Sequence, residues 1–392
     1  MTIETTTRSR LSQRVQDVPP SGIRKFFDVL ASMPDVISLG VGEPDFDTPA
    51  SIKQAGIDAL NAGRTQYTSN YGTMELREAL AAHLDRRYGV RYDPASEMLI
   101  TVGGSEALAI AMQAVVDPGD EVVLAEPSYV AYVPDVIFSG GSAIYVATRP
   151  EDGWQLDPDA VEAAITPRTK VLFLGFPCNP TGAVLEPEVR RQLADIALRH
   201  DLLVISDEVY DRLVYGGHQH EAFSALPGMR DRTILLGGFS KSYAMTGWRV
   251  GYACAPADLL EGMLKIHQYI IMSAPTMSQD AAVYALTQAD DEVERMRVEY
   301  DRRRAMFLQG LDRIGLPAVE PYGAFYAFPR IVGSGLSSEE FSERLLREQQ
   351  VAVIPGSAFG PSGEGYVRAA LATSYEDLEE ALVRIERFLD SL

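Results

Sequence analysis

The sequence predicts an α/β protein with a mostly parallel central sheet, helices on both faces of that sheet, and a smaller α+β domain. Between residues 98 and 255, short apolar runs alternate with segments of helical periodicity, as expected of the strand and helix units that build a parallel sheet. Each run is nearly all apolar, which is typical of strands buried on both faces. Beyond Pro275 the pattern changes to one long, densely charged amphipathic helix followed by isolated short strands. That change predicts the second domain.

The expected elements follow one another in a regular order. The first 15 or so residues, rich in Thr, Ser and Arg, predict a solvated N-terminal arm. In the sheet region we expect strands at 98–103, 121–127, 170–176, 202–208, 233–239 and 249–255, and helices at 105–116, 129–138 and 187–199. The C-terminal part predicts a helix over 291–313 and strands over 324–330 and 352–356.

The length of 392 residues is enough for two or three domains with a sizeable core. We divide the chain into the arm (1–15), a small α+β domain formed by 16–48 together with 286–392, and a large α/β domain (49–285).

The composition excludes several classes of protein. Lys plus Arg number 35 and Asp plus Glu 55, so the formal net charge is −20, which disfavours nucleic acids and anionic membranes as partners. No apolar run reaches the roughly 18 residues of a membrane-spanning helix, and the polar N-terminus has no signal core. The only cysteines, Cys178 and Cys254, are far apart and form no disulfide framework or CxxC metal site. We therefore expect a cytoplasmic protein.

Chemistry is expected just after the strands, because open α/β sheets bind ligands at the carboxyl ends of their strands. At one such end, Gly103 and Gly104 precede a helix that starts at Ser105 or Glu106. Free backbone N–H groups and the positive end of a helix form a cradle for phosphate, and glycine permits a close approach. A plain turn is the alternative interpretation of this short motif.

Lys241 is a candidate nucleophile. The chain has only five lysines, and Lys241 alone follows a predicted strand at the ligand end of the sheet, in the segment GGFSKSYAMTGWRVG. A lysine near other cations or shielded from water has a lowered pKa and forms imines. Arg249, eight residues later, supplies a nearby cation and a fork for phosphate. A solvated loop cation is the alternative.

Three further positions have ambiguous interpretations when taken singly. Asp207, in VISDEVYDRL, follows a strand and has Tyr210 three residues later; it could be a helix cap. Asn179, in GFPCNPTGAV, could belong to a simple turn. Arg368 lies in an apolar run and needs an anion, either a substrate or a structural carboxylate. Together with the phosphate cradle and the lysine, these residues fit one cofactor, pyridoxal 5′-phosphate, which needs a lysine, a carboxylate against its pyridine nitrogen, and a phosphate site.

At this point the sequence resembles a known family, the fold-type I pyridoxal phosphate-dependent aminotransferases of classes I and II, with aspartate and aromatic aminotransferases among them. The resemblance runs from about residue 14 to the end and includes, in the family's order, the motifs SLGVGEPDFDTP, QYTSNYGTMELREAL, NPTGAV, SDEVY and SKSYAMTGWRVGY. It implies a seven-stranded type of central sheet. It also implies a ping-pong exchange of an amino group between an L-amino acid and a 2-oxo acid such as 2-oxoglutarate.

The resemblance assigns a role to each candidate residue. Lys241 binds the cofactor as a Schiff base and then moves the substrate's Cα proton, and Asp207 keeps the pyridine nitrogen protonated. The other cofactor contacts are Tyr210 and Asn179 at the ring oxygen, Tyr129 stacked on the ring, and Gly104, Ser105, Glu106, Arg249 and Ser240 at the phosphate. Ser240 takes the place of a serine that several relatives have three residues before the lysine, where this chain has Gly238. Arg368 holds the substrate carboxylate, helped by Asn179 and the backbone near Gly40.

The same resemblance implies a homodimer with shared sites, in which Tyr67 reaches the partner subunit's cofactor phosphate; a plain loop is the alternative. The substrate side chain stays open. Arg24 would favour a dicarboxylate, whereas Tyr71, Phe325 and Tyr326 would favour bulky apolar substrates.

Rival interpretations lie within and outside this chemistry. A β-lyase or synthase on the same scaffold remains the alternative activity. A ligand-sensing transcription regulator is disfavoured, because about 15 residues are too few for a DNA-binding module. His218 and His220 lack a third ligand nearby, so we expect no metal there, and for Cys178 we expect a buried thiol.

Overall fold

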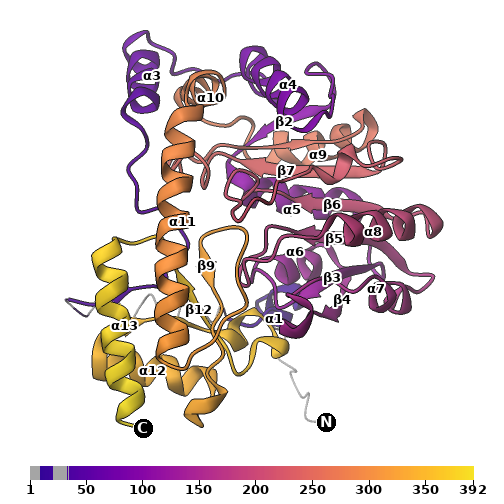
Figure 1. The fold of residues 1–392 in the computed structure, drawn as a ribbon. Coiled ribbons are helices and arrows are strands. Elements are labelled where there is room, and N and C mark those ends of the chain that lie inside the picture. The colour runs from indigo at the N-terminus through magenta and orange to yellow at the C-terminus, as the bar shows by residue number, and fades with distance from the viewer. Residues whose placement is uncertain (1–8, 21–32, 34) are drawn as a thin grey trace, which may run out of the picture.

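The computed structural model describes residues 9–20, 33 and 35–392 and has the predicted α/β architecture (Figure 1). Its centre is a seven-stranded sheet in the order β2-β8-β7-β6-β5-β3-β4. The strands are β2 (Met98–Thr101), β3 (Glu121–Glu126), β4 (Ser142–Ala147), β5 (Thr169–Gly175), β6 (Leu203–Asp207), β7 (Thr233–Gly238) and β8 (Gly251–Cys254). Only β8 runs antiparallel to its neighbours, so the sheet is mostly parallel.

Helices cover both faces of this sheet because successive strand residues point to opposite sides. In β5, Val171 and Phe173 belong to one apolar cluster, while Leu172 and Leu174 belong to another. The first cluster includes α5 (Gly103–Val115), α6 (Tyr132–Ser139) and α9 (Ala257–Ile270), and the second includes α7 (Pro158–Ala164) and α8 (Pro187–Arg199). The nearly continuous apolar runs of the sequence are therefore strands buried on both faces.

The edge strand β4 was not predicted. It begins at Ser142 and ends at Ala147, and within it only Val146 is fully buried while Tyr145 is 47% exposed. Its sequence, SAIYVA, is as apolar as those of the other strands, so β4 carries the same pattern and differs from them in its exposure at the edge of the sheet. The helix expected over 129–138 begins three residues late, at Tyr132.

The C-terminal part forms the predicted second unit of helices and short strands. Its helices are α11 (Asp290–Arg313), α12 (Ser338–Gln349) and α13 (Tyr375–Asp390). One antiparallel sheet has the order β11 (Ile354–Pro355), β12 (Val367–Ala370), β9 (Tyr326–Ala327), and β1 (Ile37–Ser38) pairs in parallel with β10 (Val351–Ala352). The strand expected over 324–330 is thus reduced to β9. The proposed boundaries at 48/49 and 285/286 stay a prediction.

Four more helices complete the described chain: α1 (Gln13–Asp17), α3 (Ala50–Asn61), α4 (Met74–Tyr88) and α10 (Thr276–Gln288). Short 3-10 turns lie at Pro150–Asp152, Phe223–Ala225, Val332–Ser334, Gly356–Phe359 and Pro361–Gly363. Of the expected N-terminal arm, residues 1–8 lie outside the described residues. Residues 9–15 are solvent-exposed, as expected, although α1 begins among them and Arg14 donates a hydrogen bond of 2.7 Å to the carbonyl of Phe138 on α6.

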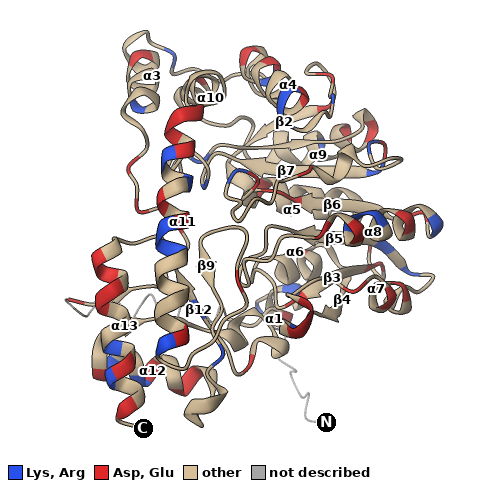
Figure 2. Cartoon of the chain, viewed as in Figure 1, with Lys and Arg blue, Asp and Glu red and all other residues tan. Residues whose placement is uncertain are grey.

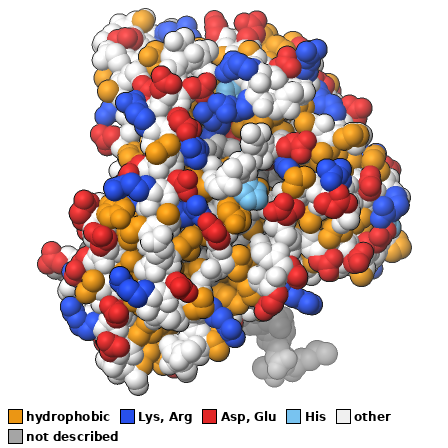
Figure 3. All heavy atoms as spheres, in the orientation of Figure 1, with side chains coloured by type: hydrophobic (Ala, Val, Ile, Leu, Met, Phe, Trp, Pro, Cys, Tyr) orange, Lys and Arg blue, Asp and Glu red, His pale blue; other side chains and the backbone are white. Residues whose placement is uncertain are grey.

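Charged side chains are spread over the surface. Figure 2 shows acidic and basic residues alternating along α11, and Figure 3 shows both signs mixed over the visible face. Across the part of the chain that the structure describes, every helix is too short or too polar to span a bilayer.

Helix α13 illustrates how local sequence sets the packing. Ser374 caps its N-terminus by accepting a hydrogen bond of 3.0 Å from the N–H of Asp377. Its buried residues are Leu378, Ala381, Leu382, Ile385 and Phe388, a helical spacing that forms one apolar stripe. The ring of Phe388 is fully buried and meets Phe341 of α12 edge to face, with 5.3 Å between centroids.

We expect Phe388→Ala to destabilise the fold by about 3 to 5 kcal/mol, because it removes buried ring surface and leaves a cavity. The urea midpoint of unfolding, followed by circular dichroism, measures the effect. Val383→Ala on the same helix is the matched control, since Val383 is 43% exposed and its truncation should leave the midpoint nearly unchanged. Equal midpoints for the two variants would contradict the assigned packing of α13.

Candidate active site

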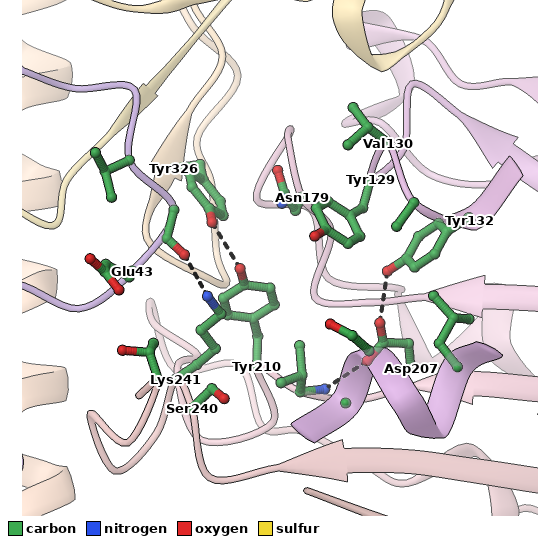
Figure 4. A pocket seen from close by; sticks show the side chains of 18 of the residues that line it. Glu43, Tyr129, Val130, Tyr132, Asn179, Asp207, Tyr210, Ser240, Lys241 and Tyr326 are labelled. Carbon is green, nitrogen blue, oxygen red and sulfur yellow. Dashed lines mark hydrogen bonds between the residues drawn. The ribbon is translucent and has the colours of Figure 1, made fainter. Parts of the chain in front are cut away.

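A cavity of about 670 Å³ lies at the carboxyl ends of β5, β6 and β7 (Figure 4). It brings together most of the candidate residues, which come from segments far apart in the sequence. Its lining includes Gly40, Gly104, Ser105, Tyr129, Asn179, Asp207, Tyr210, Ser240, Lys241, Arg249 and Arg368. Of the predicted site residues, Glu106 and Tyr67 do not line it.

Asp207 is the last residue of β6, and its carboxylate is buried in the cavity wall. It accepts a hydrogen bond of 3.0 Å from the hydroxyl of Tyr132 and one of 3.3 Å from the N–H of Val209. Burial raises the pKa of Asp207 to about 6, because few polar groups replace the lost water. Sequence reasoning missed Tyr132, although it lies three residues after Tyr129 at the start of α6.

Lys241 follows β7 and its side chain reaches the middle of the cavity. The amine donates a hydrogen bond to the carbonyl of Gly42. Burial lowers the pKa of Lys241 to about 8, with the positive charges of Arg368 and Arg249 acting in the same direction. A substantial fraction of this amine is therefore neutral, and hence nucleophilic, near neutral pH.

The first anion site is the turn between β2 and α5. Gly103 has a φ of +78°, and a Cβ atom there would lie 2.6 Å from the guanidinium of Arg249. A Cβ atom on Gly251 would lie 2.6 Å from the backbone carbon of Gly103. Glycine is thus required for the close approach of these segments. The N-terminus of α5 faces the cavity at Gly104 and Ser105, which is the arrangement that binds phosphate.

The side chain of Glu106 turns away from the cavity. Its carboxylate accepts a hydrogen bond of 2.5 Å from the N–H of Val102 and lies 2.6 Å from Nδ1 of His267 on α9. His267 is fully buried. The predicted role of Glu106 concerned its backbone amide, so the side chain's position leaves that prediction open, and nothing in the sequence pointed to His267.

The second anion site is Arg368, on β12. Its guanidinium donates a hydrogen bond of 2.9 Å to the side-chain oxygen of Asn179 and one of 2.7 Å to the carbonyl of Gly40. The residue is 2% exposed, its Nε has no partner, and no carboxylate among the described residues pairs with it. A buried arginine held only by neutral oxygens lacks charge compensation. An anionic ligand would supply it.

Other candidates take different positions. Tyr67 is 81% exposed and lies beside α10, where Thr276 donates a hydrogen bond of 2.6 Å to the carbonyl of Gln66. Tyr326 lines the cavity, whereas Tyr71 and Phe325 do not. Arg24 lies outside the described residues.

The two histidines considered as metal ligands, His218 and His220, and Cys178 contact protein groups. Nε2 of His220 lies 2.8 Å from Glu208, and the ring of His218 packs on Tyr322. Cys178 is buried. In the described ranges, no group of three or more His, Cys, Asp or Glu side chains is arranged to hold a metal ion.

At the end of an α/β sheet, a lysine with a lowered pKa lies in one cavity with a phosphate cradle and a buried arginine. Such a site is that of an enzyme that forms imines with anionic substrates. The chain belongs to the aminotransferase class I and II family, whose model matches residues 34–385. It is 49% identical to a putative aminotransferase, YugH, of Bacillus subtilis, with 97% of this chain and 98% of that protein covered. It is 47% identical to an aspartate aminotransferase of Pyrococcus abyssi at the same coverage.

Solved structures agree with this assignment. An aromatic aminotransferase from Pyrococcus horikoshii superposes with a TM-score of 0.90 at 46% identity, covering 93% of this chain and 99% of that chain. Membership of the family implies pyridoxal 5′-phosphate as cofactor, and the residues present fit it. The amine of Lys241 matches the aldehyde, the carboxylate of Asp207 matches a protonated pyridine nitrogen, and the cradle beside Arg249 matches the phosphate.

The lowered pKa of Lys241 gives a pH dependence for cofactor attachment. Only the neutral amine attacks an aldehyde, so the attachment rate should rise with pH and level off above a midpoint near 8, the pKa of Lys241. Mixing cofactor-free protein with pyridoxal phosphate at a series of pH values, followed by absorbance, measures this rate. The Lys241→Ala variant supplies the baseline. A midpoint near 10.5, the ordinary pKa of a lysine, would contradict the conclusion that burial lowers the pKa of Lys241.

Proposed function

We propose that the protein is a pyridoxal phosphate-dependent aminotransferase that moves an amino group between an L-amino acid and a 2-oxo acid such as 2-oxoglutarate. The observation that carries the proposal is Arg368, a buried guanidinium without a carboxylate partner among the described residues, in the same cavity as Lys241. A guanidinium binds an α-carboxylate in a bidentate pair. Such a pair would hold the substrate's α-carbon near the amine.

The cofactor, when bound, supplies an electron sink for the substrate's α-carbon. Asp207 would hold the proton on its ring nitrogen, and Tyr129 would stack on its ring. The phosphate would accept hydrogen bonds from the backbone amides of Gly104, Ser105 and Glu106, from the guanidinium of Arg249 and from the hydroxyl of Ser240.

Tyr210 and Asn179 would donate to the ring oxygen. The amide oxygen of Asn179 already accepts from Arg368, which leaves its N–H₂ group free to donate. Burial raises the pKa of Tyr210 well above 10, so its hydroxyl keeps the proton that it donates.

Lys241 would act on the substrate as a base and then as an acid. Once released from the cofactor, its amine would take the proton from the substrate's α-carbon and deliver it to the C4′ atom of the cofactor. A pKa near 8 suits both directions of transfer near neutral pH, because neither protonation state is strongly disfavoured.

The donor substrate is proposed to be aspartate, an aromatic amino acid or a similar L-amino acid. Aspartate and aromatic aminotransferases occur among the relatives, and the cavity wall combines Val41, Val209 and Tyr326 with charged Glu43. A panel of amino donors with 2-oxoglutarate as acceptor tests the proposal. A β-lyase or synthase would release product without converting the oxo acid, and that outcome would overturn it.

We also propose a cytoplasmic homodimer with shared sites. Tyr67 is 81% exposed, and the C-terminal end of α9 with the residues that follow it exposes Tyr269 (87%), Ile270 (60%) and Met272 (45%). The two segments are joined through α10, since Gln279 donates a hydrogen bond of 3.1 Å to Thr68. Large apolar side chains exposed in this way favour association.

Lys241→Ala should lower the turnover number by about 10⁴ or more, because the variant loses both the covalent attachment of the cofactor and the proton carrier. Borohydride reduction of the wild-type holoenzyme followed by peptide mapping should place the label on Lys241. Lys170 is the internal comparison, as its amine is paired with Asp117 and Asp120 at the opposite strand end. A label on any other lysine would overturn the assignment.

Asp207→Asn should leave the cofactor bound but reduce the turnover number by about a hundredfold, roughly 3 kcal/mol. Cofactor binding rests mainly on the phosphate contacts and on Lys241, whereas a neutral ring nitrogen is a poor electron sink. Cofactor absorbance reports occupancy, and single-turnover kinetics report removal of the α-proton. Near wild-type turnover at full occupancy would show that Asp207 has another role.

A mixed-dimer experiment tests whether Tyr67 serves the neighbouring subunit. A Lys241→Ala chain and a Tyr67→Ala chain, each nearly inactive alone, should regain activity when combined, because one site then collects both defects and the other is intact. If Tyr67 served its own subunit, every site would keep one defect. Tyr145→Ala, on the edge strand β4, is the control and should stay active alone. Verified mixed dimers without activity would rule out the shared site.

A further inference from the structure

Tyr326 of β9 lies between the two halves of the cavity. It is 1% exposed. Its hydroxyl lies 2.8 Å from the hydroxyl of Tyr210, on the cofactor side. Its ring faces the guanidinium of Arg368, on the substrate side, with 4.5 Å from the guanidinium carbon to the ring centroid. Figure 4 shows the two tyrosines meeting beside Lys241. One side chain therefore contacts a cofactor ligand through its oxygen and a substrate ligand through its ring.

The direction of the hydrogen bond follows from counting protons. A tyrosine hydroxyl has one proton to donate and can also accept. If Tyr210 donates its proton to the cofactor's ring oxygen, the bond between the two tyrosines must be donated by Tyr326. In such a chain each bond polarises the next, so the Tyr326 hydroxyl strengthens Tyr210 as a donor.

The ring of Tyr326 acts on Arg368 by a different route. Neutral oxygens hold two nitrogens of that guanidinium, and no carboxylate among the described residues compensates its charge. The face of an aromatic ring attracts a cation, more strongly when both are shielded from water. Phe359 adds a second ring, 5.0 Å from the guanidinium carbon. The rings thus fix the position in which Arg368 meets an anion.

The Tyr326 hydroxyl also lies close to the Cα atom of Gly42, which has no side chain. A Cβ atom on Gly42 would lie 2.7 Å from that hydroxyl oxygen and 3.9 Å from Arg368. Because Gly42 has no positive φ, alanine fits its backbone conformation and only the contact with the hydroxyl opposes it. The chain therefore offers a second way of displacing the hydroxyl without touching the tyrosine ring.

We propose that Tyr326 is a positioning residue with two separable functions: its hydroxyl strengthens the donation from Tyr210 to the cofactor's ring oxygen, and its ring orients Arg368 for the substrate carboxylate. This inference rests on the proposed aminotransferase function. The charged residues that line the cavity with the pair are Glu43, Asp135, Asp207, Lys241, Arg249 and Arg368, and none of them changes in the variants below.

Two variants separate the functions. Tyr326→Phe keeps the ring and removes the hydroxyl. The absorbance of the cofactor-loaded enzyme changes with pH, and the midpoint of that change should rise by about half a unit. KM for the amino donor should change less than about twofold. Tyr326→Leu also removes the ring, so KM should rise about tenfold. A merely structural role would lower stability and kcat in both variants without this division. An unshifted midpoint in Tyr326→Phe overturns the hydroxyl function, and equal KM values in the two variants overturn the ring function.

Gly42→Ala provides an independent check. It should raise the same pH midpoint as Tyr326→Phe does, because the new methyl group displaces the hydroxyl. In the double variant the missing hydroxyl leaves room for the methyl group, so the shift should equal that of Tyr326→Phe alone. Additive shifts would overturn the proposal.

Wild-type enzyme tested in parallel for 2-oxoglutarate-dependent turnover separates failure of this inference from failure of the proposed function. If the wild type neither binds pyridoxal phosphate nor exchanges amino groups, the function is wrong. If it does both and Tyr326→Phe leaves the spectrum unchanged, only the inference is wrong.

Discussion

The burial of Arg368 is the constraint on which the site depends. An arginine that is 2% exposed has lost most of its hydration, and the carbonyl of Gly40 and the amide of Asn179 return only part of that stabilisation. Lys241 experiences the same unbalanced field, since Arg368 lowers its pKa. Asp207, on the far wall, carries the opposite penalty, a pKa raised by burial. The charges of these side chains are therefore not balanced by one another, and a ligand with anionic ends and a cationic ring would balance them.

The sheet and most of the site could be predicted from the sequence because both depend on the same apolar strands. Doubly buried strands give continuous apolar runs, and their carboxyl ends place Gly104, Asp207 and Lys241 at one edge. The strand β4 was not predicted, although its sequence, SAIYVA, is as apolar as those of the other strands. Tyr132 and His267 were not predicted, and Tyr326 was expected only as a wall for bulky substrates, because their contacts are with residues distant in sequence, namely Asp207, Glu106 and Arg368. No local pattern distinguishes them from ordinary core residues.

The segment that runs from β1 towards α3 connects the two parts of the molecule across the mouth of the cavity. Its carbonyls at Gly40 and Gly42 accept from Arg368 and Lys241. Further along, the carboxylate of Asp45 accepts hydrogen bonds of 2.9 Å from Arg303 on α11. This segment thus contacts Arg368 and Lys241 through its backbone and α11 through the side chain of Asp45. Movement of α11 relative to the sheet would be transmitted to the cavity through these contacts.

The contact between Gly40 and Arg368 joins residues 328 positions apart. During synthesis the seven-stranded sheet can close once β8 has left the ribosome, and with it the cradle for phosphate. The carboxylate site cannot form until β12 has followed, more than a hundred residues later. Since domains fold as the chain emerges, a growing chain can acquire its cofactor pocket well before it can hold a substrate. Enzymatic competence therefore waits for β12, long after the phosphate cradle can form.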